Sequence, residues 1–562
     1  MQQKISFKLL PSEAADEAII KKIIANTCGK NENAVSGFHF LKKSIDARAK
    51  TIWINLTVNA FIDEPFYQRE IQQFNFNDVS KVDKKVIIIG AGPAGLFAAL
   101  QLIEKGIKPI ILERGKDVRA RRRDLAVLNK EGIVNPESNY CFGEGGAGTY
   151  SDGKLYTRSN KRGDIGRILN LFVHFGADEK ILFEAHPHIG TNKLPHIITA
   201  MRNEITNCGG EFLFEKKVID FIIINNKIKS VKTADGNIFY ADDFILATGH
   251  SARDIFELLH TKKILIEAKP FALGVRIEHP QSLIDTCQYR LSNNVGVPPL
   301  SGVLEQSEKN ELSSRRGLLP PASYSLVQQV NGRGVFSFCM CPGGIIAPAA
   351  TAPGEIVVNG WSPSKRNNPY ANSGMVVQVE LEDAVKAMKK FSMSNLAYRQ
   401  ADPEYSMFNE KNPLTLLKFQ QMIEQHCFVA GGGNSVAPAQ RMVDFSNGKS
   451  SSSLPDCSYQ PGLHSLQLKE VLPDFIYQSL AKGFIEFGKK MNGYFTNNAV
   501  VVATESRTSS PVRIPRNSDT LTHPQIKNLY PCGEGAGYAG GIVSAAMDGE
   551  RVAVQIAKII MR

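Results

Sequence analysis

The sequence contains no CxxC pair, and this absence excludes several classes of protein. Its nine cysteines are scattered and odd in number, which argues against a disulfide framework, a zinc site and an iron–sulfur cluster. We therefore expect a reducing, cytoplasmic setting and no metal. The one close pair is Cys339-Met340-Cys341. A redox dithiol is one interpretation of this pair, and two small buried packing residues is the favoured one.

Long apolar runs are also missing. The longest apolar stretch begins near residue 86 and is soon interrupted by glycine and proline, so we expect no membrane span. Residues 5–9 alternate like a strand, so we expect no signal segment at this end. A strong charge imbalance is absent too, because 66 basic residues face 55 acidic ones, for a net charge of +11. This excess permits an acidic partner, but it is small for 562 residues, so a nucleic acid is a disfavoured partner.

The most informative stretch is a β-branched run at residues 85–89 that leads directly into G-x-G-x-x-G and an apolar helix. The first glycine allows a tight turn, the second allows a pyrophosphate to approach, and the third allows the helix to pack on the sheet. We therefore expect dinucleotide binding by backbone amides at the helix start. The positions concerned are Gly90, Gly92, Pro93, Ala94 and Gly95.

A second strand, at residues 108–112, ends in Glu113, about 20 residues past the glycines as the dinucleotide fingerprint requires. Its carboxylate is the expected ligand of the ribose hydroxyls, with Arg114 beside it. The nearby basic run at residues 119–123 is interpreted as a solvated helix face, with proximity to cofactor phosphates as the alternative.

Two further glycine-containing segments predict close approach of backbone to a bulky ligand. Residues 139–154 contain five glycines, and we expect contacts from Gly145, Gly146 and Thr149. A buried strand at residues 243–249 ends in Ala247, Thr248 and Gly249, where the backbone again approaches the cofactor.

Composition and turn signals divide the chain into four segments. Residues 1–83 form a small N-terminal α+β domain, within which residues 41–48 are interpreted as a solvated connection, with a basic contact surface as the alternative. Residues 84–265 and 500–562 form the two parts of a dinucleotide domain, and residues 266–499 form an inserted substrate domain.

The segments FGEGGAGTYSDGKL, ATGHSARD, GVRIEHPQ, CMCPGG and CGEGAGYAGGIVSAAMDG resemble the family described as uncharacterised FAD-dependent dehydrogenases, within the flavoproteins that have two dinucleotide-binding domains. The resemblance spans nearly the whole chain. It implies an α/β fold in which a discontinuous Rossmann-like FAD-binding domain carries an inserted α+β substrate domain and the small N-terminal α+β domain. By resemblance, FAD also contacts Val218, Gly533, Glu534, Gly540, Gly541 and Ile542.

Four side chains are candidates for the catalytic, substrate-facing role. His250 and Arg253 follow the strand that ends at Gly249, and Arg276 and His279 fall in an alternating strand. Because 276 and 279 differ by an odd number, at most one of them should enter a pocket. An arginine there would clamp a carboxylate and a histidine would donate a proton. The alternative is an Arg276–Glu278 surface pair and a solvent-exposed histidine.

Residues 428–435 resemble a second dinucleotide-binding turn. Such a turn needs a strand before it and a helix after it, but here a predicted helix precedes the glycines and Pro438 interrupts the helix that should follow. NAD(P)H would therefore bind only transiently, as an electron donor. We predict an FAD-dependent oxidoreductase acting on an unidentified small molecule. The alternatives are a flavin-bearing nucleic-acid-binding or RNA-modifying protein and a flavoprotein without turnover. The histidine and arginine context of fumarate-reductase-type enzymes is absent, so dicarboxylate reduction is a minor option.

Overall fold

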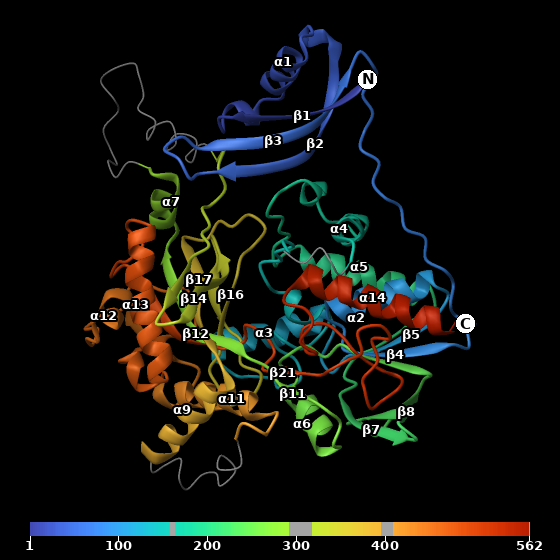
Figure 1. The fold of residues 1–562 in the computed structure, drawn as a ribbon, viewed down its shortest axis with the longest axis vertical. Helices are drawn as coiled ribbons and strands as arrows, with labels where there is room; N and C mark the ends of the chain where they lie inside the picture. Colours follow the sequence, from blue (N-terminus) through green and yellow to red (C-terminus); the bar gives the residue numbers. More distant parts are fainter. Residues whose placement is uncertain (158–162, 292–316, 395–408, 561–562) are drawn as a thin grey trace.

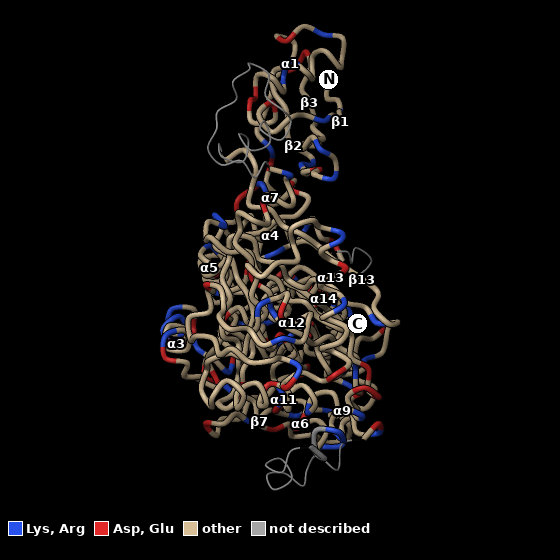
Figure 2. The backbone as a smooth tube through the Cα atoms, turned by 90° about the vertical axis from the view of Figure 1, so that its left-hand side faces the viewer, with Lys and Arg blue, Asp and Glu red and all other residues tan. Residues whose placement is uncertain are grey.

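A small N-terminal unit stands apart as a lobe above the rest of the molecule (Figures 1 and 2). The computed structural model describes residues 1–157, 163–291, 317–394 and 409–560. The unit is an antiparallel sheet in the order β1-β3-β2 that carries one helix, α1. Its elements are β1 (Gln2–Leu9), α1 (Glu17–Cys28), β2 (Val35–Asp46) and β3 (Trp53–Ile62).

The prediction of a solvated connection at residues 41–48 is wrong, because most of this segment belongs to β2. The strand is paired on both sides at Lys43. On one side Lys43 is the register partner of Leu56 in β3. On the other, its N–H donates to the Phe183 carbonyl at 2.8 Å and its carbonyl accepts from Ala185 N–H at 2.9 Å. Backbone pairing therefore holds a strand whose side chains are mostly polar.

A five-stranded parallel sheet in the order β22-β10-β4-β5-β6 forms the second unit. β22 comes from the C-terminal part of the chain and pairs with β10, so the unit is discontinuous. Helices α2 and α14 lie side by side on one face of the sheet (Figure 1). The strands are β4 (Lys85–Ile89), β5 (Lys108–Leu112), β6 (Glu211–Leu213), β10 (Asp243–Leu246) and β22 (Leu529–Pro531). The helices are α2 (Pro93–Glu104), α3 (Val118–Glu131), α4 (Ile165–His174), α5 (Leu194–Asn207), α6 (Arg253–Thr261) and α14 (Ile542–Ile560).

A separate three-stranded antiparallel sheet, in the order β7-β8-β9, lies between β6 and β10 in the chain. Its two hairpins turn at residues 225–226 and 234–237, where asparagine and glycine favour tight turns. The strands are β7 (Val218–Ile224), β8 (Lys227–Thr233) and β9 (Ile238–Tyr240).

The third unit is a seven-stranded mixed sheet in the order β13-β14-β17-β12-β20-β18-β19, with helices packed around it. Strand β20, at residues 500–505, pairs with β12 and β18 and so belongs to this sheet. Its strands are β12 (Phe271–Pro280), β13 (Val327–Val330), β14 (Arg333–Cys341), β17 (Tyr370–Val379), β18 (Ala437–Arg441), β19 (Leu463–Ser465) and β20 (Val500–Glu505).

Two small strand pairs join the mixed sheet to its surroundings, and five helices cover it. The paired strands are β11 (Glu267–Ala268) with β21 (Val512–Arg513), and β15 (Ile345–Pro348) with β16 (Val358–Trp361). The helices are α7 (Gln281–Tyr289), α9 (Leu381–Ser394), α11 (Thr415–Ala430), α12 (Met442–Asn447) and α13 (Asp474–Lys490).

Helix α11 runs directly into residues 428–435, so the prediction that a helix precedes this imitation of a dinucleotide turn is confirmed. In the part of the chain that the structure describes, no helix is long and apolar enough to cross a membrane.

Candidate functional site

The turn after β4 has the geometry that its three glycines require. Gly90 has φ +105°, and a Cβ there would lie 2.5 Å from the Ala247 carbonyl oxygen. A Cβ on Gly95 would lie 2.1 Å from the Gly90 carbonyl oxygen, so this glycine lets α2 pack on the strand. A Cβ on Gly92 would meet nothing within 4 Å. The turn is therefore closed on the sheet side and open at Gly92.

Glu113 connects three backbone segments at the end of β5. Its carboxylate accepts hydrogen bonds from the N–H groups of Ala91 at 2.9 Å, Gly115 at 2.8 Å and Gly143 at 2.9 Å. The residue is only 4% exposed. The carboxylate thus fixes the glycine turn after β4 and the glycine-rich loop against each other, a role that the sequence did not reveal.

The glycine-rich loop lies directly on the turn after β4. Gly145 N–H donates to the Ala91 carbonyl at 2.9 Å, and a Cβ on Gly146 would lie 3.0 Å from Gly92 Cα. Gly145 and Gly146 have φ +78° and +61°, which favours glycine. The fully buried Thr149 ends the short 3-10 helix at residues 146–148. Glycine is needed here for conformation and for close approach.

Arg121 is a site residue that sequence reasoning missed. It lies on α3 within the basic run interpreted as a solvated face, yet it is fully buried. Its guanidinium donates to the carbonyls of Asn139 at 2.8 Å, Tyr140 at 2.9 Å and Glu144 at 2.8 Å. The glycine-rich sequence that follows the basic run could have predicted this burial, because the carbonyls of such a loop need a hydrogen-bond donor.

The C-terminal glycine-containing segment also lies against the glycine-rich loop and the end of β10. A Cβ on Gly148 of the glycine-rich loop would lie 3.4 Å from both Pro93 Cγ and Ile542 Cγ1. A Cβ on Gly535 would lie 2.4 Å from the Gly249 carbonyl oxygen. The three glycine-containing turns and the end of β10 therefore meet at the carboxyl edge of the parallel sheet, where ligands of such sheets bind.

The same edge is open in front of two helix starts. A Cβ on Gly92, Gly249, Gly540 or Gly541 would meet nothing within 4 Å. Helices α2 and α14 begin at Pro93 and Ile542, and the first N–H groups of a helix have no partner within it. Partial positive charge at both helix starts therefore faces open space.

His250 and Glu534 face each other beside this edge, with Nε2 and Oε2 3.8 Å apart. Burial, helped by the positive charge of Arg507, lowers the pKa of His250 to about 4, so its imidazole is neutral at pH 7. Removal from water raises the pKa of Glu534 to about 7. His250 Nδ1 is buried and has no hydrogen-bond partner among the described residues. The pair is poised to hold a proton near neutral pH.

Arg253 lies at the start of α6 in a buried ionic network. Its guanidinium donates to Glu355 Oε1 at 2.6 Å and to Glu424 Oε2. Arg507 binds the same Glu424 carboxylate at 2.9 Å. Two arginines and two glutamates balance each other, so the charge of Arg253 is already neutralised by protein carboxylates.

Arg276 and His279 do not form the expected surface arrangement, and that alternative is wrong. Arg276 is fully buried and donates to Glu505 Oε2 at 2.6 Å, while Glu278 accepts from Ser458 N–H at 2.7 Å. His279 is also fully buried, and its Nε2 lies 2.9 Å from the Tyr494 carbonyl. Side chains on both faces of β12 are buried, and β17 and β20 flank the strand on its two edges.

Arg114 and Val218 occupy the rim of the Glu113 region. The Arg114 guanidinium lies between Glu137 at 2.7 Å and Asp254 at 2.8 Å. Val218 starts β7, two residues beyond Lys216, whose N–H donates to the Glu113 carbonyl at 2.9 Å. Thr248 adjoins the turn after β4, because a Cβ on Gly90 would lie 3.1 Å from its Cα.

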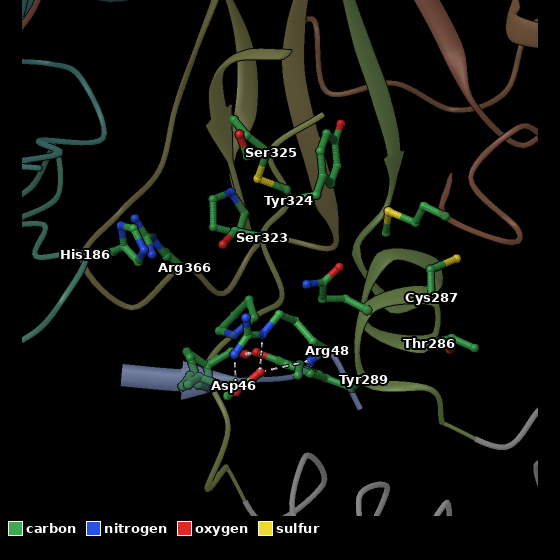
Figure 3. Close-up of a pocket in the computed structure, with 18 of the residues that line it drawn as sticks. Asp46, Arg48, His186, Thr286, Cys287, Tyr289, Ser323, Tyr324, Ser325 and Arg366 are labelled. Carbon is green, nitrogen blue, oxygen red and sulfur yellow. Dashed lines mark hydrogen bonds and ion pairs between the residues drawn. The ribbon is translucent and has the colours of Figure 1, made fainter. Parts of the chain in front are cut away.

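A cavity of about 2190 Å³ extends from the N-terminal unit toward the glycine-rich loop. Figure 3 shows Asp46 and Arg48 of the N-terminal unit on one side and His186 and Arg366 on another. The lining is strongly cationic, because seven lysine and arginine residues face only Asp46 and Glu184. The basic members are Lys43, Arg48, Lys154, Arg290, Arg366, Lys489 and Lys490.

Asp152 connects this cavity to the loop that precedes it. The carboxylate accepts from Arg366 Nη2 at 2.8 Å and lies 3.6 Å from Lys154 Nζ. It is 1% exposed and follows Thr149 by three residues. The inner end of the cavity is therefore fixed to the glycine-rich loop. Among the described residues, no group of three or more His, Cys, Asp or Glu side chains is placed to hold a metal ion.

Three family models match the chain. Residues 84–257 match the pyridine nucleotide-disulphide oxidoreductase family, residues 270–508 match the family described as FAD-dependent protein, C-terminal domain-like, and residues 1–61 match a domain of unknown function. A protein from Clostridium beijerinckii, named only as uncharacterized, is 37% identical over 560 residues, with 96% of each chain covered. A thiamine thiazole synthase from Methanococcus maripaludis is 47% identical over 55 residues, which is 9% of this chain and 20% of that one.

The chain also has low similarity to solved structures of other proteins. The tetracycline destructase Tet(51) is 11% identical, with a TM-score of 0.31 and coverage of 85% of this chain and 82% of that chain. The flavin-dependent brominase Bmp2 is 12% identical, with a TM-score of 0.33 and coverage of 85% and 79%. Scores of this size carry no argument about fold or chemistry.

Proposed function

Because the chain belongs to the family of FAD-dependent proteins with a pyridine nucleotide-disulphide oxidoreductase domain, we propose that it is an oxidoreductase that passes hydride equivalents through a tightly bound, non-covalent flavin to or from a small anionic substrate. The observation that carries the proposal is the convergence of three glycine-containing turns at one sheet edge, with both helix starts open toward the same space.

The residues at this edge fit FAD. The open Gly92 and the free N–H groups at the start of α2 suit the pyrophosphate. The start of α14, at Gly540, Gly541 and Ile542, suits the isoalloxazine, whose reduced form carries negative charge. Glu113 and Val218 are then the ribose and adenine neighbours. FAD would supply the two-electron chemistry.

The remaining site positions divide into three groups in this proposal. The backbone-contact positions that complete the cradle are Gly90, Pro93, Ala94, Gly95, Gly145, Gly146, Thr149, Ala247, Thr248, Gly249 and Gly533, with Arg114 at the rim. His250 and Glu534 are the proton-handling pair, since they adjoin the cradle and Glu534 titrates near neutrality. Arg253, Arg276 and His279 are positioning residues in this proposal, because each is buried and already hydrogen-bonded to another protein group.

The substrate class follows from the cavity. Seven cationic side chains against two acidic ones raise the local concentration of anions, and Tyr156, which is 52% exposed, offers an aromatic face. NAD(P)H is the proposed transient electron donor, since residues 428–435 follow helix α11 and do not form a second dinucleotide turn.

The test is flavin binding by a variant that fills the open side of the turn. Gly92 has φ −74° and open space around it, so Gly92→Val should fold normally. We expect its FAD affinity to fall at least about tenfold, since the side chain occupies the place of the pyrophosphate. Flavin absorbance after gel filtration measures this loss. The control is Gly334→Ala in β14, where a Cβ would meet nothing closer than 3.8 Å. A wild-type chain that takes up no added FAD would overturn the proposal.

The second candidate, a flavin-bearing protein that binds RNA, draws on the same cationic cavity. Its discriminating test is the retention of a single-stranded RNA oligonucleotide by the full chain at increasing salt. Phosphate binding must weaken steeply as salt rises. Retention that disappears in Arg290→Gln and Lys490→Gln would favour this candidate, and no retention at low salt would remove it.

A further inference from the structure

The C-terminal end of β14 carries two cysteines that no step of the proposed function uses. Cys339 and Cys341 lie on either side of Met340, and the pairing register with β17 shifts between Phe338 and Cys341. Cys339 has φ +47°, in the left-handed region that a non-glycine residue rarely adopts. Two residues of extended strand span about 6.6 Å, near the upper end of the Cα–Cα range for a disulfide. A bulge of this kind shortens that span.

Both sulfurs face the same cation. Lys154 Nζ lies 3.9 Å from Cys339 Sγ and 4.0 Å from Cys341 Sγ, and it also donates to the Met340 carbonyl. Arg276 Nη2 lies 3.7 Å from Cys341 Sγ and donates to the Cys339 carbonyl at 2.8 Å. Two positive charges therefore surround a pair of thiols.

This environment separates the two thiols chemically. The Cys341 thiol beside it, together with the positive charges of Lys154 and Arg276, lowers the pKa of Cys339 well below its ordinary value. The hydrogen bond to Cys339, together with burial, raises the pKa of Cys341. Cys339 is therefore the more acidic thiol and Cys341 the less acidic one, a difference that suits a nucleophilic and a resolving cysteine.

The pair also lies between the cavity and the flavin cradle. Cys339 and Lys154 line the cavity, whereas Cys341 is fully buried behind them. Lys154 pairs with Asp152, which follows the glycine-rich loop. On the other side, the negative charge of Cys339 contributes to the raised pKa of Glu534. A thiolate here is accessible from the cavity, and Lys154 and Asp152 connect it to the glycine-rich loop.

We propose that Cys339 and Cys341 form a redox-active dithiol that exchanges two electrons with the flavin and presents Cys339 to disulfides entering the cationic cavity. The proposal rests on the function proposed above, because the flavin is its electron partner. It also names a substrate class: a small disulfide that carries negative charge, since the cavity lining is basic.

The electron and proton balance closes without another reagent. The sulfur–sulfur bond between Cys339 and Cys341 would break on accepting two electrons and one proton, which a bound reduced flavin would supply. The products on the chain are the Cys339 thiolate and the Cys341 thiol. The Cys339 thiolate then attacks the disulfide of the substrate, which releases one substrate thiolate and leaves a mixed disulfide. The Cys341 sulfur, after passing its proton to that thiolate, displaces the second one and restores the intramolecular disulfide.

The first test counts electrons during anaerobic dithionite titration of the flavin-loaded full chain. We expect the diamide-oxidised wild type to accept about four electron equivalents per flavin, and Cys339→Ser and Cys341→Ser to accept about two. The control is Cys287→Ser, because Cys287 also lines the cavity but burial raises the pKa of its thiol. A wild type with stoichiometric flavin that accepts only two equivalents overturns the dithiol and leaves the oxidoreductase proposal standing.

The second test does not depend on flavin. Diamide treatment, alkylation and peptide mass analysis of the full chain should show an unalkylated peptide containing residues 339–341 that is lighter by two hydrogen atoms. Lys154→Gln should slow iodoacetamide labelling of Cys339 at pH 7 by about tenfold, since a lost cation raises the thiol pKa. Reduction of oxidised glutathione, which is anionic, should exceed reduction of the cationic cystamine. Full alkylation of both cysteines after diamide, or equal rates with both disulfides, contradicts the proposal.

Discussion

At the scale of single residues, the guanidinium of Arg121 holds the glycine-rich loop in place by hydrogen bonds to its carbonyls. Its guanidinium is removed from water, which lowers its pKa, and three carbonyls compensate for that cost. Arg121→Met leaves those carbonyls buried without a donor. We expect a loss of about 2–4 kcal/mol in the free energy of unfolding and weaker flavin retention, measured by urea denaturation and absorbance. The exposed neighbour on the same helix, Arg123→Met, should change stability by less than about 0.5 kcal/mol. Equal losses in both variants would contradict this role.

The raised pKa of Glu534 predicts how the free energy of unfolding changes with pH. Its pKa in the folded chain is raised to about 7 because the carboxyl is taken out of water. A carboxyl with a raised folded pKa favours folding below its unfolded pKa, near 4.5, and that contribution is lost as pH rises through 7. Between pH 5 and pH 8 the flavin-free wild type should therefore lose about 1–2 kcal/mol that Glu534→Gln does not lose. Urea denaturation at both pH values measures the difference. Glu32→Gln, at an exposed position, is the control for losing one charge, and parallel pH curves for wild type and Glu534→Gln would refute the assignment.

At the scale of helices and strands, elements with strong local signals could be predicted. The strand–turn–helix at β4 and α2 combines a β-branched run with glycines whose positions follow from backbone sterics alone. The hairpins of β7, β8 and β9 were equally clear, because asparagine and glycine mark their turns. The parallel sheet follows from these local signals.

Elements whose partners are distant in the chain could not be predicted in the same way. β2 has a mostly polar sequence and is held by backbone pairing with β3 and with residues 183–185, which no periodicity records. Arg276 finds its carboxylate at Glu505, 229 positions away, so the neighbouring Glu278 seemed the natural partner. The buried charge of Arg121 was hidden for the same reason, because its acceptors are loop carbonyls. Tertiary contacts override the local pattern at each of these positions.

At the scale of the whole molecule, the cavity depends on three units that meet only in the folded chain. The N-terminal unit contributes Lys43, Asp46 and Arg48, the parallel-sheet unit contributes Lys154, and the mixed-sheet unit contributes Arg290, Arg366, Lys489 and Lys490. A hydrogen bond from Arg290 Nη2 to the Arg48 carbonyl, at 3.0 Å, joins the mixed-sheet unit to the N-terminal unit. Residues 1–61 match a domain of unknown function, and this domain supplies part of the cavity lining.

This arrangement predicts that anions bind through the positive charge of the cavity lining. Replacing both Arg290 and Lys490 of the mixed-sheet unit with glutamine should raise the dissociation constant of inorganic tripolyphosphate by about 5- to 30-fold, at about 0.5–1 kcal/mol for each exposed charge. Raising the salt concentration should weaken wild-type binding more than binding by the double variant, because fewer charges remain to be screened. Isothermal titration calorimetry of the full chain measures both effects. The matched control, Lys4→Gln with Lys386→Gln, removes the same charge from exposed positions outside the cavity and should leave the dissociation constant within about twofold. If the control weakens binding as much as the cavity variant does, net charge and not the cavity attracts the anion, and the proposed substrate class is wrong.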